Sequence, residues 1–250
     1  MARIDSLGNF LTDVAEAIRT KKGTTDTIPA SNFDSEIASI EGGGKYAPKY
    51  IRFTGYTGTD LTEETSNLDT SNLTSMRDMF SECTGLNNID VSNFNTSNVT
   101  TMRNTFYLCA GLSSLNLKNW NTSNVTNMYY TFSNCTKLTS IDVSNWDTVN
   151  VTNMYGMFSN CANLPSLDLS SWNTSNVTNM GDMFSTCKVL KHLDIRNFDF
   201  TKVTINGSMF TSVPTDCEII VKDDTAKSWV LARRSDFTNV KTVAELEASA

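Results

Sequence analysis

Cysteines are the first residues of this chain whose type and spacing could do chemistry. Five of them recur in steps of 26 residues, at Cys83, Cys109, Cys135, Cys161 and Cys187. A zinc site needs thiolates in close pairs such as C-x-x-C, and this spacing provides none. We therefore expect buried free thiols in a repeated core. Only Cys217 falls outside the register and has no assigned environment.

Aspartates recur with the same step and form a second candidate site. This acidic ladder consists of Asp90, Asp142, Asp168 and Asp194, and Asn116 occupies the equivalent position between Asp90 and Asp142. Successive aspartates one strand spacing apart would repel one another. We expect neighbouring serine and backbone groups to donate hydrogen bonds to them, and a bound cation such as calcium is the alternative.

Catalysis needs unlike groups that converge on one point. Paired carboxylates can hydrolyse glycosides, but a ladder of equal aspartates is what copying one repeat produces. The single histidine, His192, is expected on the outward side of a strand, and the sequence holds no Ser-His-Asp order, phosphate-binding loop or H-E-x-x-H motif. We predict no enzyme, no cofactor and no metal.

The same step organises the apolar residues, so a repeated unit must position every candidate side chain. Four columns keep the register: methionines from Met76 to Met180, phenylalanines from Phe80 to Phe210, leucines from Leu86 to Leu190, and Phe or Trp from Phe94 to Phe198. Self-similarity at this period is typical of solenoids, in which stacked units share one core.

Each unit begins with a short strand. The segment Ser140–Ser144 alternates polar and apolar residues, which predicts a strand with Ile141 and Val143 on one side. The equivalent apolar pairs are Ile89/Val91, Leu115/Leu117, Leu167/Leu169, Leu193/Ile195 and Ile219/Val221. Such strands would stack about 4.8 Å apart into a parallel sheet.

A turn and a short helix are expected to follow each strand. Asn124 belongs to a column that can satisfy turn backbone groups, and Thr126 to a column well placed to cap a helix. Met128, Phe132 and Cys135 are spaced i, i+4 and i+7, which predicts one buried helical face. The fold class is therefore α/β: a leucine-rich-repeat-like solenoid of about six 26-residue coils, with a parallel sheet on one face and short helices on the other.

Composition changes at both ends of the repeats. Residues 1–41 predict a small helical anchoring module, residues 42–48 a glycine-rich linker, residues 49–222 the solenoid and residues 223–250 a C-terminal cap. Within these ranges we expect a strand at Tyr50–Phe53, a helix from Asp223 to Arg234 and a last strand at Val240–Val243.

A candidate binding surface lies where the predicted helix positions vary from repeat to repeat. One column reads Arg77, Arg103, Tyr129, Tyr155 and Gly181, and Tyr107 and Tyr130 lie nearby. Tyrosine and arginine are enriched in interface hot spots, and tyrosine rings can stack on sugars. The alternative is an ordinary solvated surface.

Charge and hydropathy exclude two classes of partner. The net charge is −7 and no lysine or arginine cluster offsets it, so we expect no nucleic acid. No run of about 20 apolar residues is present, so we expect no membrane insertion. The N-terminus resembles no signal peptide, which favours synthesis in a cytoplasm.

The repeat motif is similar to a known family. The pattern Asn-x-Met-x-x-x-Phe-x-x-Cys-x-x-Leu-x-x-(Ile/Leu)-Asp-(Val/Leu)-Ser-x-Trp, complete from Met128 to Trp146, resembles the BspA-type leucine-rich repeats of bacterial surface proteins. The likeness covers roughly residues 60–222. It implies adhesion to host proteins or other cells, with no catalytic residues to carry over.

A second resemblance concerns the N-terminus. The segments Leu11–Gly23 and Ile28–Phe33 look like short leader modules of tail and baseplate proteins of bacteriophages that infect Gram-positive bacteria. This likeness implies a virion protein, made in the host cytoplasm, whose residues 1–41 bind other virion proteins. The repeats would then bind a host cell-surface glycan or protein.

Together these patterns predict a phage tail or baseplate protein that recognises the bacterial surface. The alternatives are a BspA-type adhesin on a bacterial cell surface and a purely structural virion protein. A homo-oligomer is an option that the sequence leaves open.

Overall fold

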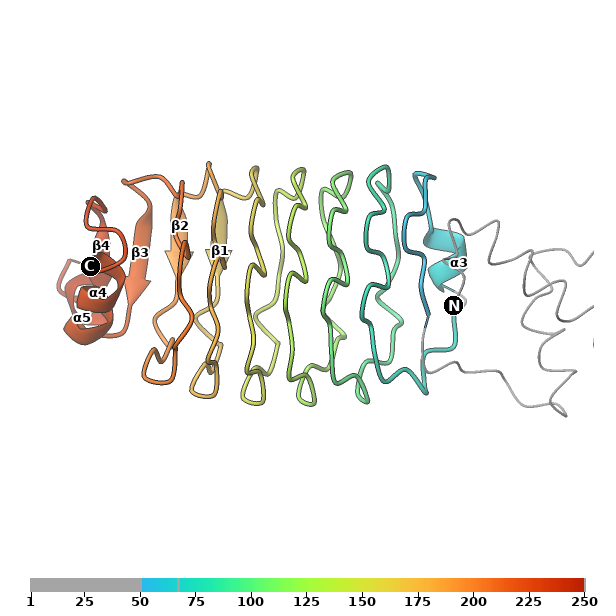
Figure 1. The fold of residues 1–250 in the computed structure, drawn as a ribbon, viewed down its shortest axis with the longest axis horizontal. Coiled ribbons are helices and arrows are strands. Elements are labelled where there is room, and N and C mark those ends of the chain that lie inside the picture. Colours follow the sequence, from blue (N-terminus) through green and yellow to red (C-terminus); the bar gives the residue numbers. More distant parts are fainter. Residues whose placement is uncertain (1–50, 67, 250) are drawn as a thin grey trace, which may run out of the picture.

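The computed structural model describes residues 51–66 and 68–249, which form a stack of coils in sequence order (Figure 1). The regular elements are few and short: α3 (Thr62–Ser66), β1 (Ser166–Asp168), β2 (His192–Asp194), β3 (Glu218–Val221), α4 (Asp224–Leu231), β4 (Val240–Thr242) and α5 (Val243–Glu247). No helix in the described ranges is long and apolar enough to cross a bilayer. The anchoring module at 1–41 and the linker at 42–48 lie outside the described residues.

A parallel sheet occupies one face of the stack towards its C-terminal end. Its order is β1-β2-β3-β4, with Leu167 opposite Leu193, Leu193 opposite Ile219, and Ile219 opposite Val240. This arrangement confirms an α/β repeat-like fold with a parallel sheet. It also confirms the last strand, at Val240–Thr242.

The strands predicted in the earlier repeats do not form as regular strands. Around Val91, Leu117 and Val143 the backbone forms no regular strand, although all three side chains are buried. Alternation of apolar residues correctly predicts which side chains point inward. It does not by itself bring neighbouring backbones into a hydrogen-bonded ladder.

The helices predicted on the opposite face are wrong. Residues 128–134 and their equivalents form consecutive turns, which we call the turn strip. Its segments are 76–82, 102–108, 128–134, 154–160, 180–186 and 206–212. Tyr130 and Asn134 have φ angles of 53° and 63°, in the left-handed region that interrupts an α-helix.

Hydrogen bonds between coils explain why the turn strip is preferred. The amide of Tyr130 donates to Tyr155 O at 2.9 Å and that of Phe132 to Met157 O at 2.9 Å, both in the next coil. The amide of Thr131 between them donates back to Met128 O at 3.3 Å. Every second amide therefore joins two coils, which a helix with purely internal bonds could not do.

The threonine column also joins coils and caps no helix. Thr126 Oγ1 donates to Thr100 O at 3.2 Å, and Thr152 Oγ1 donates to Thr126 O at 3.2 Å. The asparagine column behaves as predicted, because Asn124 Nδ2 donates to Ser97 O, a turn carbonyl of the preceding coil, at 2.7 Å. Polar side chains therefore link successive coils along the outside of the stack.

The interior is one continuous column of stacked side chains. Phe132 stacks between Phe106 and Phe158, with ring centroids 5.7 and 5.6 Å apart. Trp120 and Trp146 stack at 6.2 Å with an interplanar angle of 3°. These rings are buried, which confirms the predicted core.

The cysteines belong to this core. All six cysteines in the described ranges are free and buried. Each registered thiol donates to a phenylalanine carbonyl of the preceding coil, as Cys135 Sγ does to Phe106 O at 3.2 Å. Burial raises the pKa of the Cys135 thiol to about 12, so the reactive thiolate is suppressed. Cys217 is buried near Cys187 at the C-terminal end of the column.

The C-terminal segment contains the expected helix, α4. Asp223 caps α4 by accepting from Ala226 N at 3.0 Å, and Val230 is fully buried. The ring of Trp229 stacks on Phe200 at 3.9 Å. Helix α5, which begins with the capping box of Thr242 and Glu245, was not predicted.

The first coil differs from its prediction. Residues 51–53 form no strand, and α3 appears where no helix was expected. Phe53 donates its amide to Met79 O at 2.6 Å and stacks on Phe80 at 5.5 Å. Phe53 therefore adds one more ring to the phenylalanine column, and its amide hydrogen bond joins the first coil to the turn strip.

Candidate binding surface

The turn strip carries the side chains that differ from coil to coil. Arg77, Arg103, Tyr129 and Tyr155 occupy the same position in four successive segments, as the sequence register predicts. Backbone bonds such as Asn104 N to Tyr129 O, at 2.9 Å, hold these segments together. The four side chains consequently follow one another along the stack.

Four tyrosines gather into one group, which we call the tyrosine cluster: Tyr107, Tyr129, Tyr130 and Tyr155. Tyr129 stacks on Tyr155 with centroids 5.3 Å apart, and its ring lies 4.3 Å from that of Tyr130. Tyr130 meets the edge of Tyr155 at 5.3 Å and stacks on Tyr107 at 5.7 Å. All four side chains are half-buried. The rings contact one another, so they form a platform and leave no cage between them.

Two glycines make room for this platform. The ring of Tyr130 lies over Gly156, where an added Cβ would overlap the ring and where φ is 58°. The ring of Tyr155 lies over Gly181, where a Cβ would meet Tyr155 Cε2 at 2.8 Å. Each tyrosine therefore leans towards the next coil because that coil has no side chain in the way.

Two of the phenols, those of Tyr130 and Tyr155, have a raised pKa. Tyr155 donates a hydrogen bond to Asp182 Oδ2, and this bond holds the pKa of Tyr155 well above its usual range. Burial is the main cause of the raised pKa of Tyr130. The rings of Tyr130 and Tyr155 are therefore uncharged at physiological pH, and the hydroxyl of Tyr155 is already hydrogen-bonded to Asp182.

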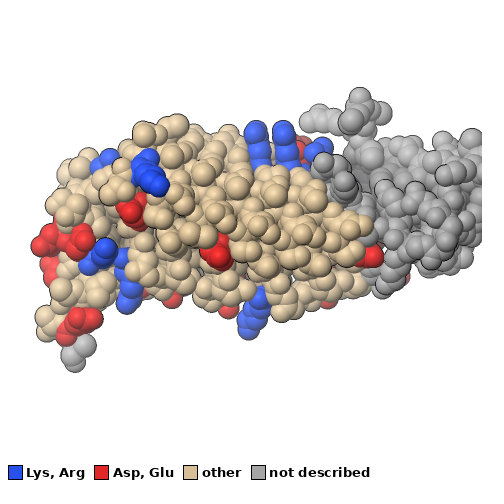
Figure 2. Space-filling view, turned by 90° about the horizontal axis from the view of Figure 1, so that it is seen from below, with Lys and Arg blue, Asp and Glu red and all other residues tan. Residues whose placement is uncertain are grey.

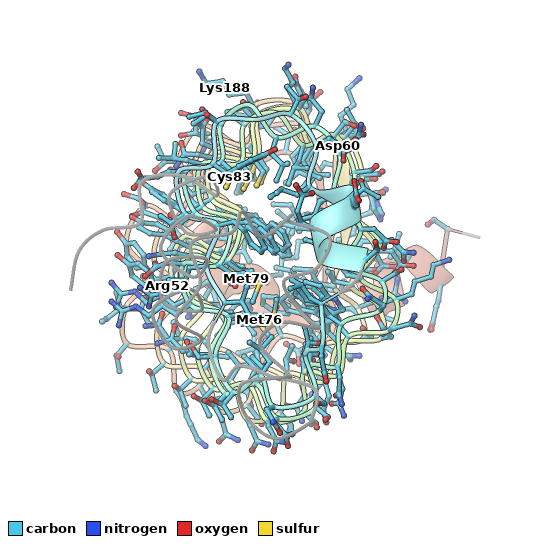
Figure 3. All side chains as sticks on the ribbon, turned by 90° about the vertical axis from the view of Figure 1, so that its right-hand side faces the viewer. Arg52, Asp60, Met76, Met79, Cys83 and Lys188 are labelled. Carbon is cyan, nitrogen blue, oxygen red and sulfur yellow. The ribbon has the colours of Figure 1, made fainter. Side chains whose placement is uncertain are left out.

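Three arginines extend the platform towards the N-terminus, and we call them the arginine row: Arg52, Arg77 and Arg103. The Arg103 guanidinium carbon lies 4.7 Å from the centroid of Tyr129. Arg77 Nε lies 3.4 Å and Arg52 Nη2 3.9 Å from Asp78 Oδ2. Looking along the stack, Figure 3 shows Arg52 on the outside, among other side-chain nitrogens. Figure 2 shows basic side chains side by side along one edge of a largely uncharged face.

The sequence analysis did not identify Arg52. It precedes Arg77 by 25 residues, one fewer than the repeat step, so a search at the fixed period passes over it. The phenylalanine column is the signal that could have found it. Phe53 stacks on Phe80 and precedes it by 27 residues, one more than the repeat step, so Arg52 lies beside this column without occupying the register position of Arg77.

The acidic ladder lies on a different surface and is satisfied within each coil. Asp90 Oδ1 accepts from Ser92 N at 2.9 Å and from Ser92 Oγ at 2.6 Å. Asp142 accepts in the same way from Ser144, at 3.2 and 2.7 Å. These bonds, from the hydroxyl first and the amide second, hold the pKa of both aspartates below the usual range.

The rest of the ladder follows the same rule. Asp168 accepts from Ser170 N at 2.9 Å, and Asp194 accepts from Arg196 N at 3.1 Å and Arg196 Nε at 3.0 Å. The donors along the ladder are serine hydroxyls, backbone amides and, at Asp194, the guanidinium of Arg196. No group of three or more His, Cys, Asp or Glu side chains in the described part of the chain could hold a metal ion.

His192 is the first residue of β2, and its side chain pairs with a glutamate of β3. Its Nδ1 lies 2.9 Å from Glu218 Oε2, and Lys241 Nζ lies 2.7 Å from the other oxygen of that carboxylate. The three groups form a polar row across the neighbouring strands β2, β3 and β4.

Comparison with known families adds one finding. The sequence profile of a family described as "Mycoplasma protein of unknown function, DUF285" matches residues 52–142 and 129–244. The two matches overlap and together span the described repeats and most of the cap. No curated protein matches the chain significantly. Both matches begin after the N-terminal segment, so they carry no information on residues 11–33.

Proposed function

The chain belongs to the DUF285 family, and from that premise we propose that it is a non-catalytic binding protein that attaches to a bacterial cell surface. The arginine row and the tyrosine cluster make the contact. The observation that carries this proposal is the position of four half-buried tyrosine rings and three arginines on one strip of a stack that is otherwise nearly uniform. Aromatic and arginine side chains of this kind supply most of the energy in binding interfaces.

The setting we propose is a phage virion. Its support is the likeness of residues 11–33 to leader modules of tail and baseplate proteins. In this setting residues 1–41 bind other virion proteins, and the stack presents the strip to the host.

A BspA-type adhesin on a bacterial surface is the second candidate. Its support is the repeat motif, together with a family description that names a Mycoplasma protein. A purely structural virion protein is a weaker candidate, because it gives no reason for aromatic side chains to gather on an outer surface.

Binding to purified bacterial cell walls tests the proposal. We expect saturable binding that Tyr129→Ala and Tyr155→Ala each weaken about tenfold, the effect of losing one hot-spot side chain of about 1.4 kcal/mol. Lys137→Ala, which changes an exposed side chain away from the turn strip, is the control and should leave the affinity unchanged.

Absence of saturable binding, or equal affinities for the tyrosine variants and the control, contradicts the proposal. Antibody labelling then separates the two settings, since a virion protein is detected on purified phage particles and an adhesin on intact bacteria.

A further inference from the structure

We propose that the ligand of this surface is a linear acidic polysaccharide that runs along the axis of the stack. Its anionic groups would lie on the arginine row and a sugar ring on Tyr129 and Tyr155. This inference rests on the proposed function and names the class of ligand for the same surface.

The arginine row carries positive charge that neighbouring carboxylates only partly neutralise. The side chains of Arg52 and Arg77 are 53% and 51% exposed, and they share a single carboxylate, Asp78. Within the described residues Arg103 has no ion-pair partner, and its Nε is buried without a hydrogen bond. The row is therefore a local excess of positive charge on a chain whose net charge is −7, which attracts an anion at this place.

The spacing between successive coils favours an extended ligand over a compact one. Asp78 N donates to Arg103 O at 3.0 Å and Asn104 N donates to Tyr129 O at 2.9 Å, so each position is one coil from the next. Hydrogen-bonded chains of this kind lie about 4.8 Å apart. A compact anion would reach one or two of the arginines. A chain molecule with charges at intervals reaches all three and continues onto the rings.

The rings of the tyrosine cluster pack closely against one another. Because the centroids of Tyr129, Tyr130 and Tyr155 lie only 4.3 to 5.3 Å apart, no ligand fits between them. This arrangement excludes the aromatic cage that binds quaternary ammonium groups. It favours a flat ligand face laid across the outside of the cluster, as the apolar face of a sugar ring is.

Asp182 decides between polymers. Nucleic acids also combine charge with stacking, but each nucleotide carries a phosphate that needs a basic groove along its whole length. Here the positive row ends at Arg103, and a carboxylate, Asp182, stands beside the last ring. A polymer with neutral units between its charged ones fits this sequence of groups better than a nucleic acid.

Titration of the full chain with defined polymers tests the inference. We use hyaluronan, polygalacturonate and chondroitin sulfate as acidic probes, dextran as the neutral probe and oligothymidylate as the nucleic-acid probe. We expect at least one acidic polysaccharide to bind, its affinity to fall as salt rises, and dextran not to bind. Failure of all three acidic probes, or tighter binding of oligothymidylate, overturns the inference.

Two pairs of variants assign the roles. Arg77→Ala and Arg103→Ala should each weaken binding about tenfold and flatten its salt dependence, whereas Lys137→Ala removes the same charge elsewhere and should do neither. Tyr129→Phe keeps a ring and should bind like the parent protein, and Tyr129→Leu should not. All these side chains are at least partly exposed, and thermal unfolding verifies that each variant is folded. Equal effects of the arginine and Lys137 variants contradict the assignment.

The cell-wall assay separates this inference from the proposed function. If Tyr129→Ala weakens binding to cell walls while no acidic polysaccharide binds, the proposed function stands and the ligand class is wrong. If cell walls do not bind at all, both fail.

Discussion

The turn strip and the strip that carries the acidic ladder are two outer surfaces built from the same repeat, yet they use their polar groups in opposite ways. On the ladder, the Oδ1 atoms of Asp90 and Asp142 accept hydrogen bonds from serines of their own coil. On the turn strip, Arg103 has an Nε without a partner and Tyr129 and Tyr155 expose part of their rings. Side chains that repeat serve the stack, and those that change from coil to coil are the ones that we propose contact a ligand.

The largest expected effect comes from the core that both surfaces share. Phe132→Ala removes a fully buried ring that stacks on two neighbours, so we expect the free energy of unfolding to fall by about 3–5 kcal/mol. Urea denaturation measures this value. Tyr129→Ala, a ring of the surface cluster, should cost far less. Similar losses for the two variants would mean that the cluster is structural.

A smaller effect is expected where the turn strip makes room for its rings. Gly156→Ala places a Cβ in the ring of Tyr130 at a residue with a φ of 58°, so we expect a loss of about 1–3 kcal/mol and weaker ligand binding. Gly207→Ala is the matched control, because nothing lies within 4 Å of its Cβ position. If both glycine variants behave alike, the platform does not depend on these contacts.

The smallest effect is expected on the ladder. Asp142→Asn introduces the residue that Asn116 already provides at the equivalent position, where Oδ1 accepts a long hydrogen bond of 3.5 Å from Lys118 N. We expect the free energy of unfolding to fall by less than about 1 kcal/mol and ligand binding to stay unchanged. The carboxylate has a lowered pKa in the folded state, so its contribution is present above the unfolded value, about 3.9, and is lost as pH falls through the folded value.

Acid titration of stability therefore sharpens the comparison. The parent protein should lose more stability than Asp142→Asn between pH 5 and more acidic values, as followed by circular dichroism. A weaker affinity for the ligand in Asp142→Asn would show that the ladder belongs to the binding surface after all.

Much of the fold was predictable because burial follows the repeat. The columns through Phe132, Trp146 and Cys135 are buried as expected, and the cap at α4 covers the last coil. The spacing of Met128, Phe132 and Cys135 did not distinguish a helix from consecutive turns. Both structures bury these positions, and the choice depends on hydrogen bonds to the next coil, which a single repeat does not reveal.

The binding surface was predictable as a set of residues and not as an arrangement. The register placed Arg77, Arg103, Tyr129 and Tyr155 in one column. That Tyr130 lies over Gly156 depends on a left-handed φ at Tyr130. The repeat column of Tyr130 also contains Asp78, Asn104 and Gly156, residue types that favour this conformation, so the sequence marks the φ but not the position of the ring. Arg52 was missed because the first coil, from Phe53 to Phe80, spans 27 residues and falls outside the 26-residue register.

The backbone hydrogen bonds that join one turn-strip segment to the next all run in one direction, and this gives the strip an electric axis. In each segment alternate amides point towards the C-terminal coil and alternate carbonyls towards the N-terminal one, as Tyr130 N and Tyr129 O do. The peptide dipoles therefore add, as in a helix, and do not cancel as in an ordinary sheet. The negative pole is the end where Arg52 and Arg77 lie, and Asp182 lies towards the positive pole. The backbone itself thus favours the polarity of the charges that line the surface.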